Sequence, residues 1–390
     1  MAPTLNQLLH ALSAPFWLLT LGCAAGFALL WWWTLGHRRW QRRRLLQRRL
    51  AEVGNGGNGG GGGGSGGGEG GDGSGSGATN SRPAAHPLTS TAPGTSSVLH
   101  PRFLFVGDAA ADVAGLLRAG GALPQRATPS APWQAWTQLA MTAIALAPGV
   151  AENATTAASP TNATNATNAA DAADATNAED VADRRARRLW LQGLLALAEQ
   201  HPALPLNGIV VCVAAEALPQ APRRLAALVQ EAAQLLQLQM PVYVVVTGLE
   251  RLQGYAQVCA GLPPEVLAQA LGHCFIEPDT SGGSAAPRLD ALFAPLAARL
   301  QALGMALVRD QPDPAARLAI VHWVEQVLAL QAGLGTLVDQ LFVPPAGAQW
   351  RGLYLAAAAS PAGPGAFATD LFQRFLPGDQ SLARPARHLR

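Results

Sequence analysis

The 390-residue chain contains no lysine, so all 27 of its basic side chains are arginines. Residues 1–50 hold seven of these arginines and no acidic residue. Residues 51–390 therefore carry 20 arginines against 25 acidic side chains, a net charge of −5. A nucleic-acid-binding protein would concentrate positive charge on its folded part, so nucleic acid is not an expected partner.

Cysteine is also sparse. The four cysteines, Cys23, Cys212, Cys259 and Cys274, have the spacing of neither a zinc knuckle nor a Cys-x-x-Cys redox pair. We therefore predict that the thiols are reduced and that the chain holds no metal.

One long apolar stretch lies near the N-terminus. Residues 15–36 carry no charge over a length that crosses ~30 Å of hydrocarbon as a helix, and three tryptophans lie at its end. The arginines follow this stretch, whereas a cleaved signal peptide carries its positive charge first. The positive-inside rule predicts a single pass, with residues 1–14 periplasmic and the rest of the chain cytoplasmic. The basic segment 37–53 is expected to orient the anchor and to lie on anionic headgroups.

Two tracts lack the apolar surface needed for folding. Residues 54–99 are rich in Gly, Ser and Pro and are predicted to be a disordered linker with a reach of roughly 35–40 Å. Residues 151–181 contain a tandem Asn-Ala-Thr repeat and are predicted to be a low-complexity insertion. The remaining domain covers residues 100–380 and is followed by a tail at 381–390.

Alternating apolar segments predict the fold class of this domain. Buried strands are expected at residues 103–106, 139–145, 208–214 and 242–247; the last two are continuous apolar runs typical of parallel strands covered on both faces. Helical periodicity is clearest at residues 223–238, 289–307 and 318–342. We predict an α/β domain with a doubly wound, mainly parallel sheet and C-terminal helices, in which ligands would bind at the carboxyl ends of the strands.

Several sequence segments resemble the cytoplasmic domain of the IcmF/TssM family, whose members are inner-membrane components of bacterial type VI secretion. They are PLNGIVVCVAAEAL (205–218), MPVYVVVTGLERLQGY (240–255), WRGLYL (350–355) and FATDLFQRFLP (367–377). The resemblance extends from about Pro101 to Pro377 and implies a P-loop-NTPase-like, GTPase-like fold. That family usually has two N-terminal membrane helices and a large periplasmic region, so this chain is expected to act beside a full-length relative or to be a remnant.

The loop after the first expected strand tests whether the domain binds nucleotide. A phosphate loop requires Gly-x-x-x-x-Gly-Lys-Ser/Thr, and Gly107 matches only the first glycine. Asp112, Val113 and Ala114 replace the second glycine, the lysine and the hydroxyl, and Asp112 adds a charge that repels phosphate.

The other two nucleotide motifs are altered in the same way. Leu146 replaces the Asp that would help to hold Mg²⁺, although Gly149 of that turn is retained. In TGLE at 247–250, Gly248 replaces the lysine and Glu250 the Asp of the guanine-reading motif. We therefore expect a pseudo-GTPase that is not an enzyme, with no catalytic, cofactor-binding or metal-binding residues.

Other polar residues are assigned ordinary roles. A surface loop is expected to hold His273, Cys274, Glu277 and Asp279, whose spacing matches no metal site. Surface or capping positions are expected for His201 and His322. Asn153, Asn162 and Asn165 are formal glycosylation acceptors, but we expect no glycosylation there because the repeat is predicted to be cytoplasmic.

These observations favour a non-catalytic, membrane-anchored component or accessory of a type VI secretion system. It would be a scaffold at the cytoplasmic face of the bacterial inner membrane. The expected partners are other membrane-complex or baseplate subunits, and membrane lipids through the anchor and the arginine cluster, with no nucleotide. The alternative is a divergent nucleotide switch or weak NTPase in which Arg102 or Arg118 replaces the lysine. A third possibility is an orphan without a remaining partner.

Overall fold

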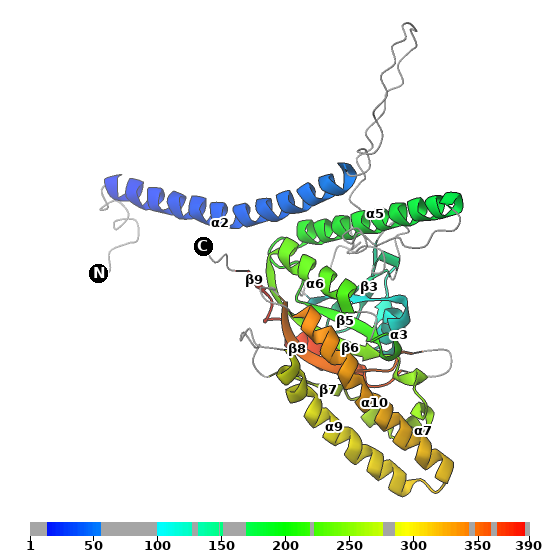
Figure 1. The fold of residues 1–390 in the computed structure, drawn as a ribbon. Helices are drawn as coiled ribbons and strands as arrows, with labels where there is room; N and C mark the ends of the chain where they lie inside the picture. The colour runs from blue at the N-terminus through cyan, green and yellow to red at the C-terminus, as the bar shows by residue number, and fades with distance from the viewer. Residues whose placement is uncertain are drawn as a thin grey trace, which may run out of the picture.

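The computed structural model describes nine parts of the chain (Figure 1). They are residues 14–55, 100–126, 132–147, 149–150, 169–218, 222–275, 285–342, 348–359 and 365–386. The expected linker, apart from its first two residues, and residues 151–168 of the expected insertion lie outside the described residues.

A single helix, α2 (Ala14–Asn55), contains both the expected anchor and the basic segment. Its 42 residues correspond to a rod of about 63 Å. The anchor and the basic segment are therefore continuous in backbone structure.

A nine-stranded sheet forms the centre of the domain. The strands are β1 (Arg102–Gly107), β2 (Leu123–Pro124), β3 (Trp133–Thr137), β4 (Thr142–Leu146), β5 (Gly208–Ala214), β6 (Leu238–Thr247), β7 (Leu271–Cys274), β8 (Ala348–Leu355) and β9 (Arg384–Pro385). Their order is β2-β3-β4-β1-β5-β6-β8-β7, with β9 paired to the start of β6. Strands β4, β1, β5, β6 and β8 are parallel, whereas β2, β3 and β7 run antiparallel to their neighbours.

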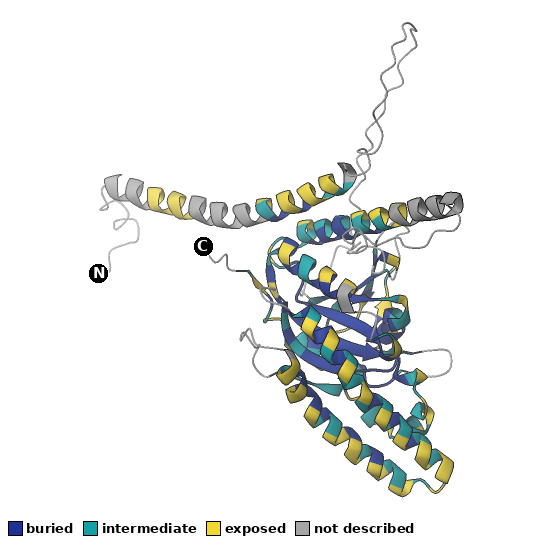
Figure 2. Cartoon of the chain, viewed as in Figure 1, coloured by how far each residue is buried: buried dark blue, intermediate teal, exposed yellow. Residues whose placement is uncertain are grey.

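Helices cover both faces of the sheet. They are α3 (Val113–Ala119), α5 (Ala169–Gln200), α6 (Pro222–Leu236), α7 (Tyr255–Ala260), α8 (Pro264–Ala268), α9 (Ala285–Asp310), α10 (Pro314–Leu341) and α11 (Leu376–Gly378). Neighbouring residues of β1 point to opposite faces of the sheet and into two separate cores. Leu104 packs with α5, α6 and α10 on one face, and Phe105 packs with α3 and the helical turn Leu371–Phe375 on the other. Figure 2 shows the strands buried and the outer helix faces exposed. The prediction of a mixed α/β domain with a mostly parallel sheet and C-terminal helices is confirmed.

Three local predictions differ from the structure. The second expected strand begins at Thr142 rather than at residue 139, because residues 138–141 turn between β3 and β4. Residues 169–181, expected in the low-complexity insertion, belong to α5. His273 and Cys274 lie in β7, not in a loop, because they pair with Leu353 and Gly352 of β8.

Two helices of the described residues are long and apolar enough to cross a membrane, judged by length and composition alone. They are Ala286–Asp310 and Pro314–Leu341. Both also pack on the domain, through residues such as Phe293 and Trp323. Much of the expected anchor has side chains outside the described residues, so the single membrane span stays a prediction.

A partly buried ion pair joins the last part of the chain to the sheet. Arg351 of β8 donates two hydrogen bonds to the carboxylate of Asp379, over 2.7 and 2.8 Å, and Tyr243 of β6 donates its hydroxyl to the same carboxylate over 2.7 Å. The hydrogen bonds to Asp379 raise the pKa of Arg351, and burial followed by the Asp379 charge raises the pKa of Tyr243.

Removal of this carboxylate should destabilise the domain. Asp379→Ala removes the shared acceptor of a partly buried guanidinium and of the buried Tyr243 hydroxyl, so we expect a loss of about 3 kcal/mol. That corresponds to a fall of about 6–12 °C in the melting temperature of the detergent-solubilised chain. In the matched control, Glu52→Ala breaks the Arg49–Glu52 pair, whose side chains are 59% and 63% exposed, and should change stability by less than about 0.5 kcal/mol. Equal shifts for the two variants would contradict the prediction.

Candidate functional site

The sheet topology places the loop after β1 where an α/β protein would bind a ligand. From β1 the chain proceeds to β4 on one side, and it later returns to β5 on the other side. The carboxyl end of β1 is therefore a topological switch point, where doubly wound sheets open a crevice. Residues 107–113 occupy this point.

Close packing at the start of the loop explains why Gly107 is retained. A Cβ atom on Gly107 would lie 2.8 Å from the carbonyl oxygen of Cys212 on the adjacent strand. Burial, and then the nearby Asp108 carboxylate, raise the pKa of the Cys212 thiol, which is therefore a packing group rather than a nucleophile. The first glycine of the expected motif is thus needed for backbone packing.

The protein's own carboxylates cap the backbone N–H groups at this site. Asp108 Oδ1 accepts a hydrogen bond from Ala111 N, and Asp112 Oδ1 accepts one from Gly115 N, each over 2.9 Å. Asp112 adopts a left-handed backbone with φ 40° and caps the start of α3. N–H groups at a helix start are the donors that hold phosphate in nucleotide-binding proteins. Here, carboxylates occupy two of these donors.

The loop after β6 also contacts the turn at residues 108–112, through the backbone carbonyls of that turn. Thr247 Oγ1, fully buried, donates to the carbonyl of Ala111 over 2.8 Å, and Arg251 Nη2 donates to the carbonyl of Ala110 over 2.9 Å. Glu250 accepts from the backbone N–H of Ala358 over 3.1 Å. Thr247 and Glu250 therefore join three loops at the carboxyl edge.

Arg251 is a site residue that sequence reasoning missed. Besides its bond to the Ala110 carbonyl, it forms an ion pair with Glu216 at 3.5 Å. Its position directly after the TGLE motif is the feature of the sequence that could have identified it as a site residue. The two arginines that we considered as lysine substitutes are placed differently: Arg102 lies at the opposite end of β1 and donates to the carbonyls of Leu204 and Pro205, and Arg118 lies in the last turn of α3.

The remaining candidate residues do not converge. Among the described residues, no group of three His, Cys, Asp or Glu side chains could hold a metal ion. Glu277 and Asp279 lie outside the described residues, as do the three asparagines of the repeat. Burial and the charge of Arg102 lower the pKa of His201 to about 4, at the amino edge of the sheet.

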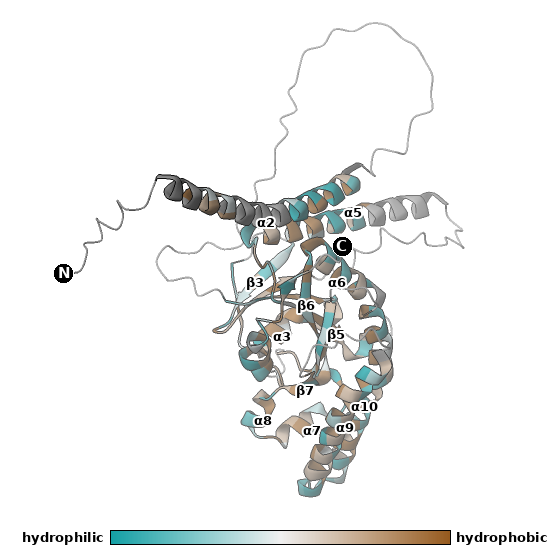
Figure 3. Cartoon of the chain, turned by 90° about the vertical axis from the view of Figure 1, so that its left-hand side faces the viewer, coloured by the Kyte–Doolittle hydropathy of each residue, from teal (hydrophilic) through white to brown (hydrophobic). Residues whose placement is uncertain are grey.

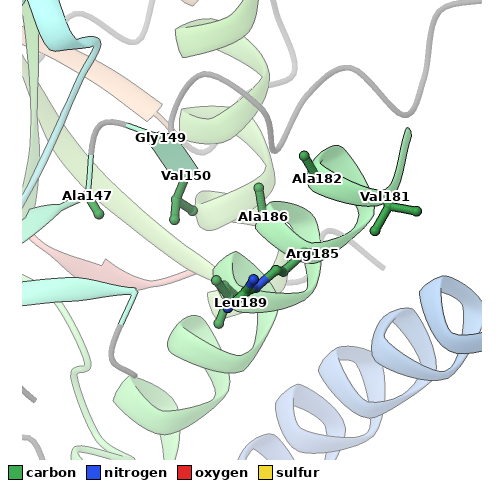
Figure 4. A pocket seen from close by; sticks show the side chains of 8 residues that line it. All are labelled: Ala147, Gly149, Val150, Val181, Ala182, Arg185, Ala186 and Leu189. Atoms are coloured by element: carbon green, nitrogen blue, oxygen red, sulfur yellow. The ribbon is translucent and has the colours of Figure 1, made fainter. Parts of the chain in front are cut away.

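An open pocket of about 410 Å³ lies between the end of β4 and α5. Its lining residues are Ala147, Gly149, Val150, Val181, Ala182, Arg185, Ala186 and Leu189. Figure 4 shows the first three facing the residues of α5. Arg185 is the charged residue of this lining, so the pocket offers no pair of groups for acid–base catalysis.

The described residues thus include an α/β domain whose carboxyl edge is held by internal hydrogen bonds, and comparisons with known proteins show what the chain is similar to. Residues 183–364 match the model of the IcmF-related N-terminal domain. The chain is also 29% identical over 167 residues to the type VI secretion system component TssM1 of Pseudomonas aeruginosa. No solved structure matches the chain. These findings confirm the resemblance predicted from the sequence: the chain carries an IcmF/TssM-like domain.

The extent of these matches is limited. The TssM1 alignment covers 40% of this chain and 15% of the relative. The family match starts at residue 183, so strands β1 to β4 and the loop at 107–113 lie outside it. The interpretation of that loop as an altered phosphate loop remains a prediction.

The left-handed backbone of Asp112 leads to a test with two substitutions. Asp112→Ala removes the side-chain cap of α3. It also leaves an alanine, which has a Cβ atom, in the strained left-handed backbone at φ 40°. We therefore expect the free energy of unfolding to fall by about 1–2 kcal/mol. Asp112→Gly removes the same carboxylate but tolerates the backbone, and should cost only a few tenths of a kcal/mol. Chemical denaturation measures both. Equal destabilisation would show that backbone conformation does not restrict this position.

Proposed function

We propose that this chain is a non-catalytic, membrane-anchored component of a bacterial type VI secretion system, and that its α/β domain is a scaffold for other subunits at the cytoplasmic face of the inner membrane. The likeness to TssM1 supports the assignment to this machinery. The observation that carries the non-catalytic part is the capping of the loop at 107–113 by Asp108 and Asp112.

Electrostatics explains why this loop is unsuited to nucleotide. A phosphate group would have to displace the two carboxylates from their N–H donors and would then lie beside their negative charge. The chain has no lysine, and Arg251, which contacts this loop, already uses its guanidinium to bond a carbonyl and to pair with Glu216. We therefore regard the domain as a pseudo-GTPase.

The anchor is the second part of the proposal. In α2, the side chains of Leu21 and Phe27 are 71% and 78% exposed, so the protein itself leaves this apolar surface uncovered. Hydrocarbon would cover it, and by the positive-inside rule the arginines that follow favour a cytoplasmic domain and a periplasmic N-terminus. A single pass at 15–36 is the simplest arrangement compatible with the packing of α9 and α10 on the domain.

The scaffold function predicts specific co-purification. Tagged full-length chain, purified from detergent-solubilised membranes of its host, should enrich membrane-complex or baseplate subunits of the secretion system, as identified by mass spectrometry. The control is the same anchor, residues 1–55, fused to an unrelated domain. If both samples contain the same proteins, the domain recruits no partner and the scaffold proposal is wrong.

The absence of nucleotide binding is a separate prediction. Calorimetric titration of the solubilised chain with GTP or ATP in the presence of Mg²⁺ should give no saturable heat, because the loop donors are occupied. A P-loop protein with an intact lysine is the positive control. Saturable binding that Arg251→Ala abolishes would instead support the alternative, a divergent nucleotide switch.

A further inference from the structure

Helix α2 does not stand apart from the domain; its second half packs on it. Leu46 is fully buried and Arg42 is 4% exposed, and Leu50 and Val53 pack partly buried against the larger core. Helix α5 provides most of the contact surface, and two views show α2 and α5 side by side (Figures 1 and 3). The basic segment, expected to lie on lipid headgroups, is therefore in part a domain contact.

Two polar contacts show where α2 lies along α5. Arg42 Nη1 donates to the carbonyl of Pro202 over 3.1 Å, and Arg43 Nε lies 3.1 Å from Glu199 Oε1. Both partners are at the C-terminal end of α5, so the two helices run antiparallel. The first half of α2 thus projects beyond the domain on the side of β9, and α3 and α7 lie on the other side (Figure 1).

We propose that α2 is a rigid arm that orients the domain, with the amino edge of the sheet facing an anionic lipid surface and the carboxyl edge facing away from it. This inference rests on the membrane span at 15–36 in the proposed function. Arg42 is six residues beyond that span, or about 9 Å along a helix, so the contact at Pro202 lies near the headgroups.

The amino edge can be traced from the contact with α2. Pro202 leads into Asn207, which donates to the carbonyl of Gln380 over 3.0 Å, and β9 pairs with the start of β6 at the same edge. Exposed Arg384 in β9 and exposed Arg44 in α2 provide positive charge on this side. Anionic headgroups are the lipid chemistry that such side chains recognise.

Burial, rather than charge, dominates the docking. The Arg43–Glu199 pair is 55% and 37% exposed and therefore contributes little, whereas Leu46 is removed from water completely. The segment between residues 55 and 100 makes the docking intramolecular, with an effective concentration on the order of millimolar. A charged residue at position 46 should therefore release the helix.

The docking can be tested in detergent, without membrane or partners. A site-specific protease sequence is inserted between residues 56 and 99 of the full chain, and the cut protein is passed over a size-exclusion column. We expect the N-terminal fragment to co-elute with the domain in the parent and in Leu45→Asp, where the native side chain is 38% exposed. In Leu46→Asp the N-terminal fragment should no longer co-elute with the domain. The near-ultraviolet circular dichroism spectrum of the domain should stay unchanged, which shows that the domain is still folded. Release of the parent fragment, or equal release by both variants, overturns the docking.

The orientation is tested in vesicles of phosphatidylglycerol and phosphatidylethanolamine with nitroxide-labelled headgroups. A fluorophore is attached at Ser381→Cys, on the amino edge, or at Ala109→Cys, on the carboxyl edge; both positions are exposed. Cys23, Cys259 and Cys274 are replaced by alanine, and buried Cys212 is kept. We expect at least severalfold stronger quenching at Ser381. Equal quenching, or stronger quenching at Ala109, overturns the orientation.

The two experiments separate this inference from the proposed function. A retained fragment combined with failure to insert into vesicles shows that the anchor is wrong, and with it the orientation. Insertion combined with release of the fragment leaves the anchor valid and shows that the arm is not rigid. Secretion partners are needed in neither experiment.

Discussion

The structure depends on a parallel sheet whose central strands are shielded from water on both faces. Every residue of β5 is buried, and Leu104 and Phe105 of β1 point into opposite cores. Such strands require helices on both faces, because a parallel sheet gains its stability from two-sided burial. The helix layers in turn leave the two loop-bearing edges of the sheet as the natural places for interaction.

The two edges are built differently. At the carboxyl edge, Asp108, Asp112, Thr247 and Arg251 consume donors and acceptors that a ligand would use. A preorganised binding site keeps such groups available for its ligand, because breaking internal hydrogen bonds lowers affinity. A polar edge held by its own hydrogen bonds would suit contact with a protein surface, which is what the proposed scaffold function requires.

Sequence patterns predicted the elements with strong periodicity and little else. Strands β1, β5 and β6 and helices α6, α9 and α10 were identified, since continuous apolar runs and helical spacing leave few alternatives. Strand β3 was missed because Trp133 and Trp136 are mixed with polar residues in five positions, and β7 because its pairing partner β8 is distant in sequence. At the site, the missing lysine was evident, but the contact from Arg251 to the turn depends on tertiary structure.

The docking of α2 also changes what the Gly-rich segment has to do. As a free tether, its length would set the distance and orientation of the domain relative to the membrane. With Leu46 buried in the domain, the segment instead joins two points that are already fixed by packing. Each doubling of such a connection costs only about 0.6 kcal/mol of closure free energy. Composition and length at residues 56–99 are then weakly constrained, whereas the choice between Leu45 and Leu46 as the buried side chain is strongly constrained, because adjacent residues on a helix point in directions about 100° apart.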